Sequence, residues 1–334
     1  MDSIDLVGLA RNLIDIESTS GREHKASTWL AAWLTARDYQ VVQQPVAGNR
    51  FNIIATLNPP EVVFSTHIDC VPPFFPSREK DGILFGRGAC DAKGILAAQL
   101  AALERLRAGG ERRVGLLVVV GEERGSHGAL AANTRTPGSR YLINGEPTDN
   151  RLGAATRGAY RVKLSARGRA VHSSHPELGE SAIEKLVDAL VTLRTLDLPE
   201  DDTLGRTYYT VGLLSGGIAP NVVPPIAEAE VTFRTVGSAA HVRKALGPLS
   251  AYVNLKDVVE VPPVTLTTVP GFDTAVFPFT TDIPFLSAWG QPLLFGPGSV
   301  LVAHTAEEHV RIEELRHAVD HYTSLAERLL RSNA

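Results

Sequence analysis

Two adjacent glutamates, Glu122 and Glu123, follow an apolar segment at 114–120 that has the pattern of a buried strand. Neighbouring carboxylates at the end of a strand can divide the work of a metal hydrolase, because one can bind the ion while the other moves a proton. Pairs of glutamates are also common on solvated surfaces. The pair therefore gains meaning only from the other metal-type residues of the chain.

A histidine stands at the end of another apolar segment, 62–66, with an aspartate two residues further on: His67 and Asp69. A metal-bound histidine usually donates its second ring N–H to a carboxylate or another acceptor, which fixes the tautomer and raises the basicity of the ring. Asp69 is placed to orient His67 in this way. A hydrogen-bonded core histidine is the alternative interpretation.

Three further positions carry metal-type side chains. Asp91 lies in a glycine-rich turn, 86–94, that leads into a predicted helix. An aspartate there is also a favoured helix N-cap, and a phosphate loop is a third option, although the turn lacks the Gly-Lys-Ser/Thr ending. Glu146 follows a short strand at 141–144, and His304 precedes the last helix. Ordinary loop residues are the alternative for both.

Together these positions supply two imidazoles and three carboxylates: His67, Asp91, Glu123, Glu146 and His304. Such a set suits Zn2+ and is acceptable to Co2+ or Mn2+. If Asp91 bridges two ions, each ion has three protein ligands and keeps a position for water, whereas structural zinc sites are usually closed and contain cysteine. The two cysteines, Cys70 and Cys90, are interpreted as buried fillers in a reducing compartment, with a disulfide or a thiolate ligand as the alternatives.

The elements that must position these side chains alternate between helix and strand. We expect helices at 1–17, 23–37, 92–107 and 311–331, and strands at 41–44, 52–57, 62–66, 113–120, 141–144 and 293–296. This alternation predicts a layered α/β domain. Between 158 and 266 the order changes to β-α-β-β-α-β, which is that of a ferredoxin-like unit: strands at 159–166, 208–214, 227–235 and 258–261, helices at 181–193 and 239–246. We predict a catalytic domain, 1–157 and 267–334, with an α+β domain, 158–266, inserted into it.

Composition excludes several classes of function. The 334 residues carry a net charge of -4 with acidic and basic residues intermixed, so no broad basic surface for nucleic acid or anionic membrane is expected. No apolar run reaches the roughly 18 residues of a membrane helix. The first residues lack the basic start and apolar core of a signal peptide. The sequence therefore predicts a cytoplasmic protein.

The chain resembles the M20 group of co-catalytic zinc amidohydrolases and peptidases. The matching segments, in the family's order, are 65–69, 86–94, 121–126, 144–147, 171–174 with Pro176, 216–221, and 296–298 through His304. Within that group it looks closest to acetylornithine deacetylase and succinyl-diaminopimelate desuccinylase, on the strength of 281–284, 294–298 and 303–308.

The resemblance implies a three-layer zinc-peptidase-like catalytic domain holding two zinc ions per chain, and an inserted lid domain through which subunits form a homodimer. It assigns His67 and Glu146 to one ion, Glu123 and His304 to the other, Asp91 to both, Asp69 to a place behind His67, and the role of general base to Glu122. A cis peptide bond after Asp91 is also expected. Oxyanion and substrate contacts follow by the same resemblance: His172 as an oxyanion donor from the partner subunit, and Asn221, Arg234 and Gly298 as substrate-binding residues. Arg234 offers a bidentate fork for a carboxylate, with a solvent-facing arginine as the alternative.

These features predict a metal-dependent amide hydrolase that removes an N-acyl group, acetyl in the first instance, from a small-molecule amino acid such as N-acetylornithine, in arginine or related amino-acid biosynthesis. N-acetylcitrulline, N-acetyllysine and succinylated diamines stay open, because the chain is shorter than most members and has Ala92 where many have methionine. The alternatives are a dipeptidase or carboxypeptidase of the same fold and a non-catalytic, metal-stabilised binding protein. The presence of Glu122 argues against the last, since a structural site needs no free base.

Overall fold

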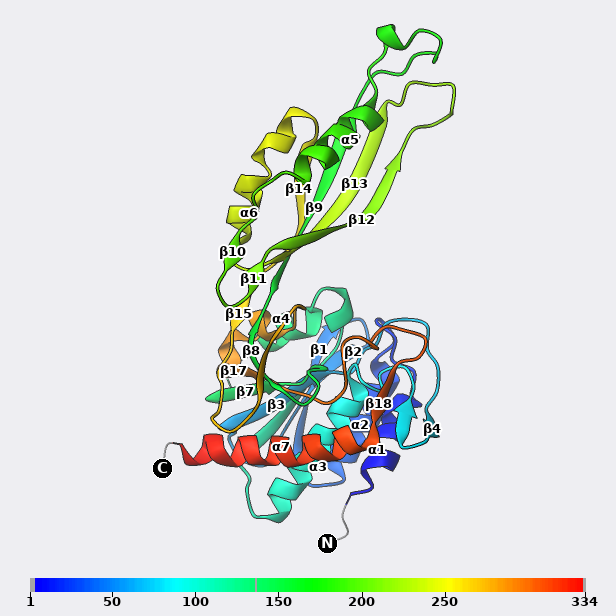
Figure 1. The fold of residues 1–334 in the computed structure, drawn as a ribbon. Helices are drawn as coiled ribbons and strands as arrows, with labels where there is room; N and C mark the ends of the chain where they lie inside the picture. Colours follow the sequence, from blue (N-terminus) through cyan, green and yellow to red (C-terminus); the bar gives the residue numbers. More distant parts are fainter. Residues whose placement is uncertain (1–3, 136, 333–334) are drawn as a thin grey trace. The chain divides into compact units, whose positions relative to one another are not determined.

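The computed structural model describes residues 4–135 and 137–332 and divides into two compact units (Figure 1). Unit 1 comprises Met1–Ala154, Leu266–Ala275 and Thr281–Ala334, and unit 2 comprises Ala155–Thr265 and Val276–Thr280. The boundaries predicted from the sequence lie at 157/158 and 266/267, and the predicted insertion does not include 276–280. The roles of the inserted part as a lid and as a dimerisation domain remain predictions.

Unit 1 is built on a six-stranded sheet in the order β1-β2-β6-β3-β7-β17. Its strands are β1 (Gln40–Ala47), β2 (Arg50–Thr56), β3 (Val62–His67), β6 (Val114–Val119), β7 (Tyr141–Asn144) and β17 (Gln291–Leu294). β6, β3, β7 and β17 run parallel to one another. β2 runs antiparallel to both of its neighbours, β1 and β6. The carboxyl ends of the four parallel strands therefore meet at one edge of the sheet.

Both faces of this sheet are covered, so its central strands β3 and β6 are buried along their whole length. On one face Phe64 and Leu116 join a large core with α1 (Leu6–Ile14), α2 (His24–Thr35), α3 (Lys93–Ala108) and α7 (Ile312–Arg331). On the other face Val63 and Leu117 pack with α4 (His127–Ala132) and with Trp289 of the 3-10 helix η5 (Ser287–Trp289). Because successive strand residues point to opposite faces, the result is the predicted three-layer α/β arrangement.

Two small sheets were not expected from the sequence. One has the order β18-β5-β4 and contains β4 (Arg78–Lys80), β5 (Ile83–Phe85) and β18 (His309–Arg311). The other, β15-β8-β16, consists of β8 (Leu152–Thr156), β15 (Val264–Thr265) and β16 (Thr274–Phe277), close to the places where the chain passes between the units. Most of these strands have only two to four residues, and β4 is exposed throughout. Strands this short, or this exposed, leave no alternating apolar pattern in the sequence.

Unit 2 has a four-stranded antiparallel sheet in the order β12-β13-β9-β14. The elements follow the predicted order β-α-β-β-α-β: β9 (Gly158–Arg167), α5 (Ala182–Leu193), β12 (Tyr208–Gly216), β13 (Ile226–Thr235), α6 (Ala239–Ala245) and β14 (Asn254–Val261). A short hairpin, β10 (Glu200–Asp201) and β11 (Gly205–Arg206), precedes β12. Both helices pack on one face of the sheet, over alternate residues such as Val162 and Val231, and the opposite face carries polar side chains.

Several element ends differ from the prediction. The expected helix at 1–17 is confined to α1, where the Asp5 side chain caps the helix by accepting from the Gly8 N–H at 2.9 Å; residues 1–3 lie outside the described part of the chain. The expected strand at 293–296 is β17, which ends at Leu294. Across residues 4–135 and 137–332, none of the helices combines the length and the apolar character that crossing a bilayer requires.

Candidate metal centre

The candidate ligands gather where the parallel strands of unit 1 end. β3 ends at His67, and β6 is followed by the 3-10 helix η1 (Glu122–Arg124). β7 is followed by Glu146, and His304 lies in the loop after β17. Polar sites in open α/β sheets lie beyond the carboxyl ends of the strands, and this arrangement follows that rule. Asp91 joins them from the loop that leads into α3, and its peptide bond to Ala92 is cis, as expected.

The five side chains form two groups that share one residue. In the first group, His67, Asp91 and Glu146 place one ligand atom each within 4.8 Å of one another, and in the second Asp91, Glu123 and His304 do the same. Asp91 Oδ1 lies 3.0 Å from Nε2 of His67, and Asp91 Oδ2 lies 3.2 Å from Nε2 of His304. Nε2 of His304 is also 3.0 Å from Oε1 of Glu123. One carboxylate thus faces both imidazoles, which is the geometry expected of a bridging ligand.

The chemistry of the site fits divalent cations. Oε1 of Glu146 is buried without a hydrogen-bond partner and lies 4.0 Å from Nε2 of His67. Burial, followed by the charge of Glu146, raises the pKa of Glu122, and burial also raises the pKa of Glu146. Buried carboxylates that repel one another are costly unless positive charge compensates them. Imidazole nitrogens and carboxylate oxygens are also the donor set that Zn2+ takes.

The second ligand group, Asp91, Glu123 and His304, also needs positive charge, as the pKa of its histidine indicates. Hydrogen bonds to Asp91 and Glu123 raise the pKa of His304 to about 10, so that the ring itself carries a proton between the two carboxylates. Burial acts to raise the pKa of Asp91, but hydrogen bonds from His304 and His67 outweigh it and hold that pKa below its usual range. Metal ions displace such protons from histidine when they bind.

The carboxylate of Asp69 lies closer to the turn that carries the two glutamates than to His67. Nδ1 of His67 is 2.9 Å from the backbone oxygen of Asp69 and 3.6 Å from its carboxylate. The carboxylate instead accepts four hydrogen bonds, from the backbone N–H of Gly121 at 2.8 Å, Glu122 at 3.1 Å and Glu123 at 3.3 Å, and from the Ser20 hydroxyl at 2.9 Å. The ring of His67 is therefore oriented by the backbone oxygen of Asp69, while the carboxylate holds the turn that carries both glutamates. The catalytic role of Asp69 remains a prediction.

Three residues of unit 1, the two cysteines and Gly298, have packing roles. Cys70 and Cys90 are free and buried, in agreement with their interpretation as fillers, and burial raises the pKa of the Cys70 thiol to about 12. Gly298 has a φ of +81°, and a Cβ atom there would lie 2.7 Å from Cβ of Cys90. This close approach explains the glycine, while its contact with substrate stays a prediction.

The remaining predicted residues belong to unit 2. His172 is exposed; its Nδ1 lies 2.8 Å from the Ser174 hydroxyl, and its backbone pairs with Val222, next to Asn221. Arg234 is half-buried on the polar face of β13, and burial lowers the pKa of its guanidinium. The structure therefore brings His172 and Asn221 onto neighbouring loops of unit 2. Their roles in oxyanion and substrate binding remain predictions.

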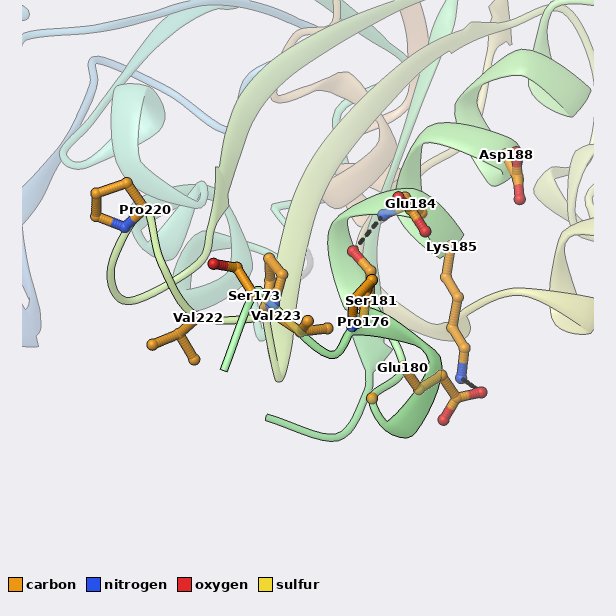
Figure 2. Close-up of a pocket in the computed structure, with 12 residues that line it drawn as sticks. Ser173, Pro176, Glu180, Ser181, Glu184, Lys185, Asp188, Pro220, Val222 and Val223 are labelled. Atoms are coloured by element: carbon orange, nitrogen blue, oxygen red, sulfur yellow. Dashed lines mark hydrogen bonds and ion pairs between the residues drawn. The ribbon is translucent and has the colours of Figure 1, made fainter. Parts of the chain in front are cut away.

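A pocket of about 480 Å3 lies beside these loops in unit 2 (Figure 2). It is lined on one side by Ser173 and Pro220 and on the other by the start of α5, where Nζ of Lys185 pairs with Glu180 at 2.7 Å. None of its lining residues belongs to the two candidate ligand groups.

Two buried acids of unit 1, Asp282 and Glu308, have no predicted role. Asp282 is 1% exposed, and burial raises its pKa to about 6. Its charge contributes to the raised pKa of Glu122 and of Glu146. Glu308, fully buried, contacts the loop that carries Asp91. Both residues lie in segments that carry the family resemblance, but no pattern in the sequence indicates that they are buried.

Comparison with known proteins identifies the family. The model of the family described as Peptidase family M20/M25/M40 matches residues 63–328, so the chain belongs to this family of metallopeptidases. A protein of Aspergillus clavatus named "Probable carboxypeptidase" is 37% identical, over 97% of this chain and 82% of that protein.

Solved structures share the fold. A tripeptidase from Staphylococcus aureus superposes with a TM-score of 0.85 at 19% identity, covering 99% of both chains. A dinuclear metal-binding peptidase of the M20 family from Bacillus subtilis gives a TM-score of 0.71 at 17% identity, covering 96% of both chains. The family thus includes dinuclear peptidases, and this chain has candidate ligand groups for two ions.

These comparisons change the expected activity. The activity predicted from the sequence is that of an N-acyl-amino-acid deacetylase, with a dipeptidase or carboxypeptidase as the alternative. The relatives and structures described above are peptidases by name, and a particular similarity to acetylornithine deacetylase is not supported. The peptidase alternative therefore fits better, and a place in arginine biosynthesis has no support.

Proposed function

We propose that this chain is a two-metal carboxypeptidase that acts on short peptides. The observation that carries the proposal is the sharing of Asp91 between two ligand groups, with Glu122 next to one of the ligands, Glu123. Structural metal sites have no use for a base beside their ligands, whereas hydrolysis requires one. The choice of a carboxypeptidase rests on the name of the Aspergillus clavatus relative.

Each of the five ligand candidates has one part in this proposal. His67 and Glu146 would hold one ion, Glu123 and His304 the other, and Asp91 would bridge them. Bound divalent cations would polarise the scissile carbonyl and make a water molecule more acidic at neutral pH. Zn2+ suits the donors best, and Co2+ or Mn2+ would also be accepted.

Glu122 is the proposed general base. It would take the proton from the attacking water and pass it to the leaving amine. A free glutamate is too weak a base for this, and the raised pKa caused by burial brings the carboxylate closer to the value that the transfer needs. Asp69 would fix its position through the backbone N–H groups of the turn.

A carboxypeptidase must also recognise the free carboxylate at the end of its substrate. Arg234 is the proposed partner. Its guanidinium is half-buried and has no acidic partner among the described residues, so it can pair with a carboxylate of the substrate. Asn221 and Gly298 would add polar contacts, and His172 of a second subunit would donate to the oxyanion.

The proposed second subunit would be another copy of this chain. β12 is an edge strand of the unit 2 sheet, and it exposes Leu213 and Leu214 by 63% and 64%. α5 presents Val187 and Val191 to solvent at helical spacing. An unpaired, apolar edge strand is prone to pair with another strand, and a two-fold axis would allow two copies of β12 to pair with each other.

The free cysteines agree with a cytoplasmic location, which also remains a proposal.

A substrate panel tests the proposed activity. The zinc-loaded protein is offered dipeptides and tripeptides in three forms: free at both ends, blocked at the amino end, or amidated at the carboxyl end. A carboxypeptidase cleaves the amino-blocked peptides and leaves the amidated ones, an aminopeptidase does the reverse, and a dipeptidase needs both ends free. N-acetylornithine is included for comparison, and Glu122→Ala is the inactive control. Cleavage of N-acetylornithine alone would refute the proposal.

A further inference from the structure

Glu308 makes an unusual set of contacts. It lies four residues after His304 and is fully buried. Its Oε1 accepts hydrogen bonds from three backbone N–H groups of the loop before α3, those of Gly88 at 2.9 Å, Cys90 at 3.3 Å and Asp91 at 3.2 Å. Its Oε2 pairs with Nη1 of Arg87, which is also buried, at 2.5 Å. One carboxylate thus holds three backbone N–H groups of the turn and the side chain of Arg87.

This turn is fixed at a second place through Arg87. Nε of Arg87 donates to the backbone oxygen of Pro73 at 3.1 Å, and its guanidinium lies over the ring of Phe75, 4.9 Å from the ring centroid. The backbone N–H of Arg87 also donates to the Phe75 oxygen. Glu308 therefore bonds to a loop whose other side is already attached to the segment around Pro73.

The position of the turn decides where Asp91 points. The Asp91 carboxylate must present Oδ1 to His67 and Oδ2 to His304, at 3.0 and 3.2 Å. Its own backbone N–H is one of the three that Glu308 holds. Because charged hydrogen bonds are stronger than neutral ones, a buried carboxylate restrains such a loop better than a neutral acceptor would.

We propose that Glu308 is a positioning residue for the bridging aspartate: it fixes the Gly88–Asp91 backbone so that Asp91 can serve both metal ions. This inference rests on the proposed two-metal function. Residues that orient metal ligands typically change metal affinity by about 10- to 100-fold when they are replaced. A residue with a merely structural role would lower the melting temperature without changing metal affinity in the folded protein.

The test measures Zn2+ binding by competition with a chromophoric chelator, on the full chain and well below its melting temperature. Glu308→Gln keeps the shape of the side chain and removes its charge. Glu308→Asp keeps the charge beside Arg87, and thereby the fold, but shortens the side chain by one methylene, so that it cannot reach all three N–H groups. Glu307→Gln is the matched control, because Glu307 is the neighbouring exposed glutamate. Circular dichroism confirms that each variant is folded.

We expect Zn2+ to bind about 10- to 100-fold more weakly to the Glu308 variants, with both ions affected because Asp91 belongs to both groups. The Glu307 variant should stay within about twofold of the wild type. Wild-type affinity in folded Glu308→Gln and Glu308→Asp, whatever their melting temperatures, would overturn the inference. If the wild-type chain itself bound no zinc, the proposed metal centre would fail instead, so the two failures are distinguishable.

Discussion

Replacing Asp69 by asparagine should reduce turnover strongly although the new side chain has nearly the same shape. The Asp69 carboxylate is completely buried and accepts four hydrogen bonds, three of them from the turn that carries Glu122. An asparagine keeps one acceptor oxygen and replaces the other by an NH2 group. If the amide oxygen keeps the N–H groups of Gly121 and Glu122, the NH2 group meets the N–H of Glu123, which then has no acceptor.

The size of the effect follows from these contacts. The variant loses a charged hydrogen bond and leaves a partly buried N–H unpaired, and together these changes cost about 2–3 kcal/mol. For a domain of roughly 150–250 residues, each kcal/mol lowers Tm by about 2–4 °C, so a decrease of about 4–12 °C is expected. Displacement of the general base by about 1 Å can lower the rate about 100-fold.

Thermal melts and steady-state kinetics on a cleaved peptide provide the measurement. Asp69→Asn should lower kcat by about 100-fold and change KM little, because the turn places a reacting group and makes no proposed contact with the substrate. Ser20→Ala is the matched control: it removes the fourth hydrogen bond of the same carboxylate, costs about 1 kcal/mol and leaves kcat nearly unchanged. An Asp69→Asn protein with wild-type kcat would refute this role for Asp69.

Three further predictions concern the base, the metal and the subunit contact. Glu122→Ala should lower kcat by about 100- to 10,000-fold, while elemental analysis should find the same zinc content as in the wild type. A variant that loses its zinc would show that Glu122 is a ligand. Removal of metal by a chelator should lower Tm, and zinc at about 100 times its Kd should raise the free energy of unfolding by about 2.7 kcal/mol. Equal melting curves with and without metal would contradict the proposed metal centre. Leu213→Lys on β12 should yield monomers in sedimentation analysis, whereas Leu130→Lys, at an exposed site of unit 1, should not; a wild-type chain that is itself monomeric would exclude the proposed dimer.

The fold could be predicted largely because the buried elements leave regular patterns. β6 is an unbroken apolar run and β3 begins with one, since both faces of the sheet are covered. In unit 2, β9 and β13 alternate because one face of their sheet is polar. Exposed strands of two or three residues, such as β4, leave no such pattern.

The candidate site could be predicted in part from residue types and their places at strand ends. His67 and Glu123 follow apolar strands, and parallel strands bring such positions to one edge of the sheet. Glu308 and Asp282 could not be given a role in this way, because nothing local distinguishes a buried acid from a solvated one. The choice between peptide and N-acyl substrates was also beyond the sequence, since both reactions break an amide bond and need the same metal chemistry.

Native mass spectrometry, by counting zinc ions per chain in the wild type and in His304→Ala, shows whether two ions share Asp91. His304 belongs to only one of the two ligand groups, while Asp91 belongs to both. We expect two ions in the wild type and no more than one in the variant. Two tightly bound ions in His304→Ala, or none in the wild type, would contradict it.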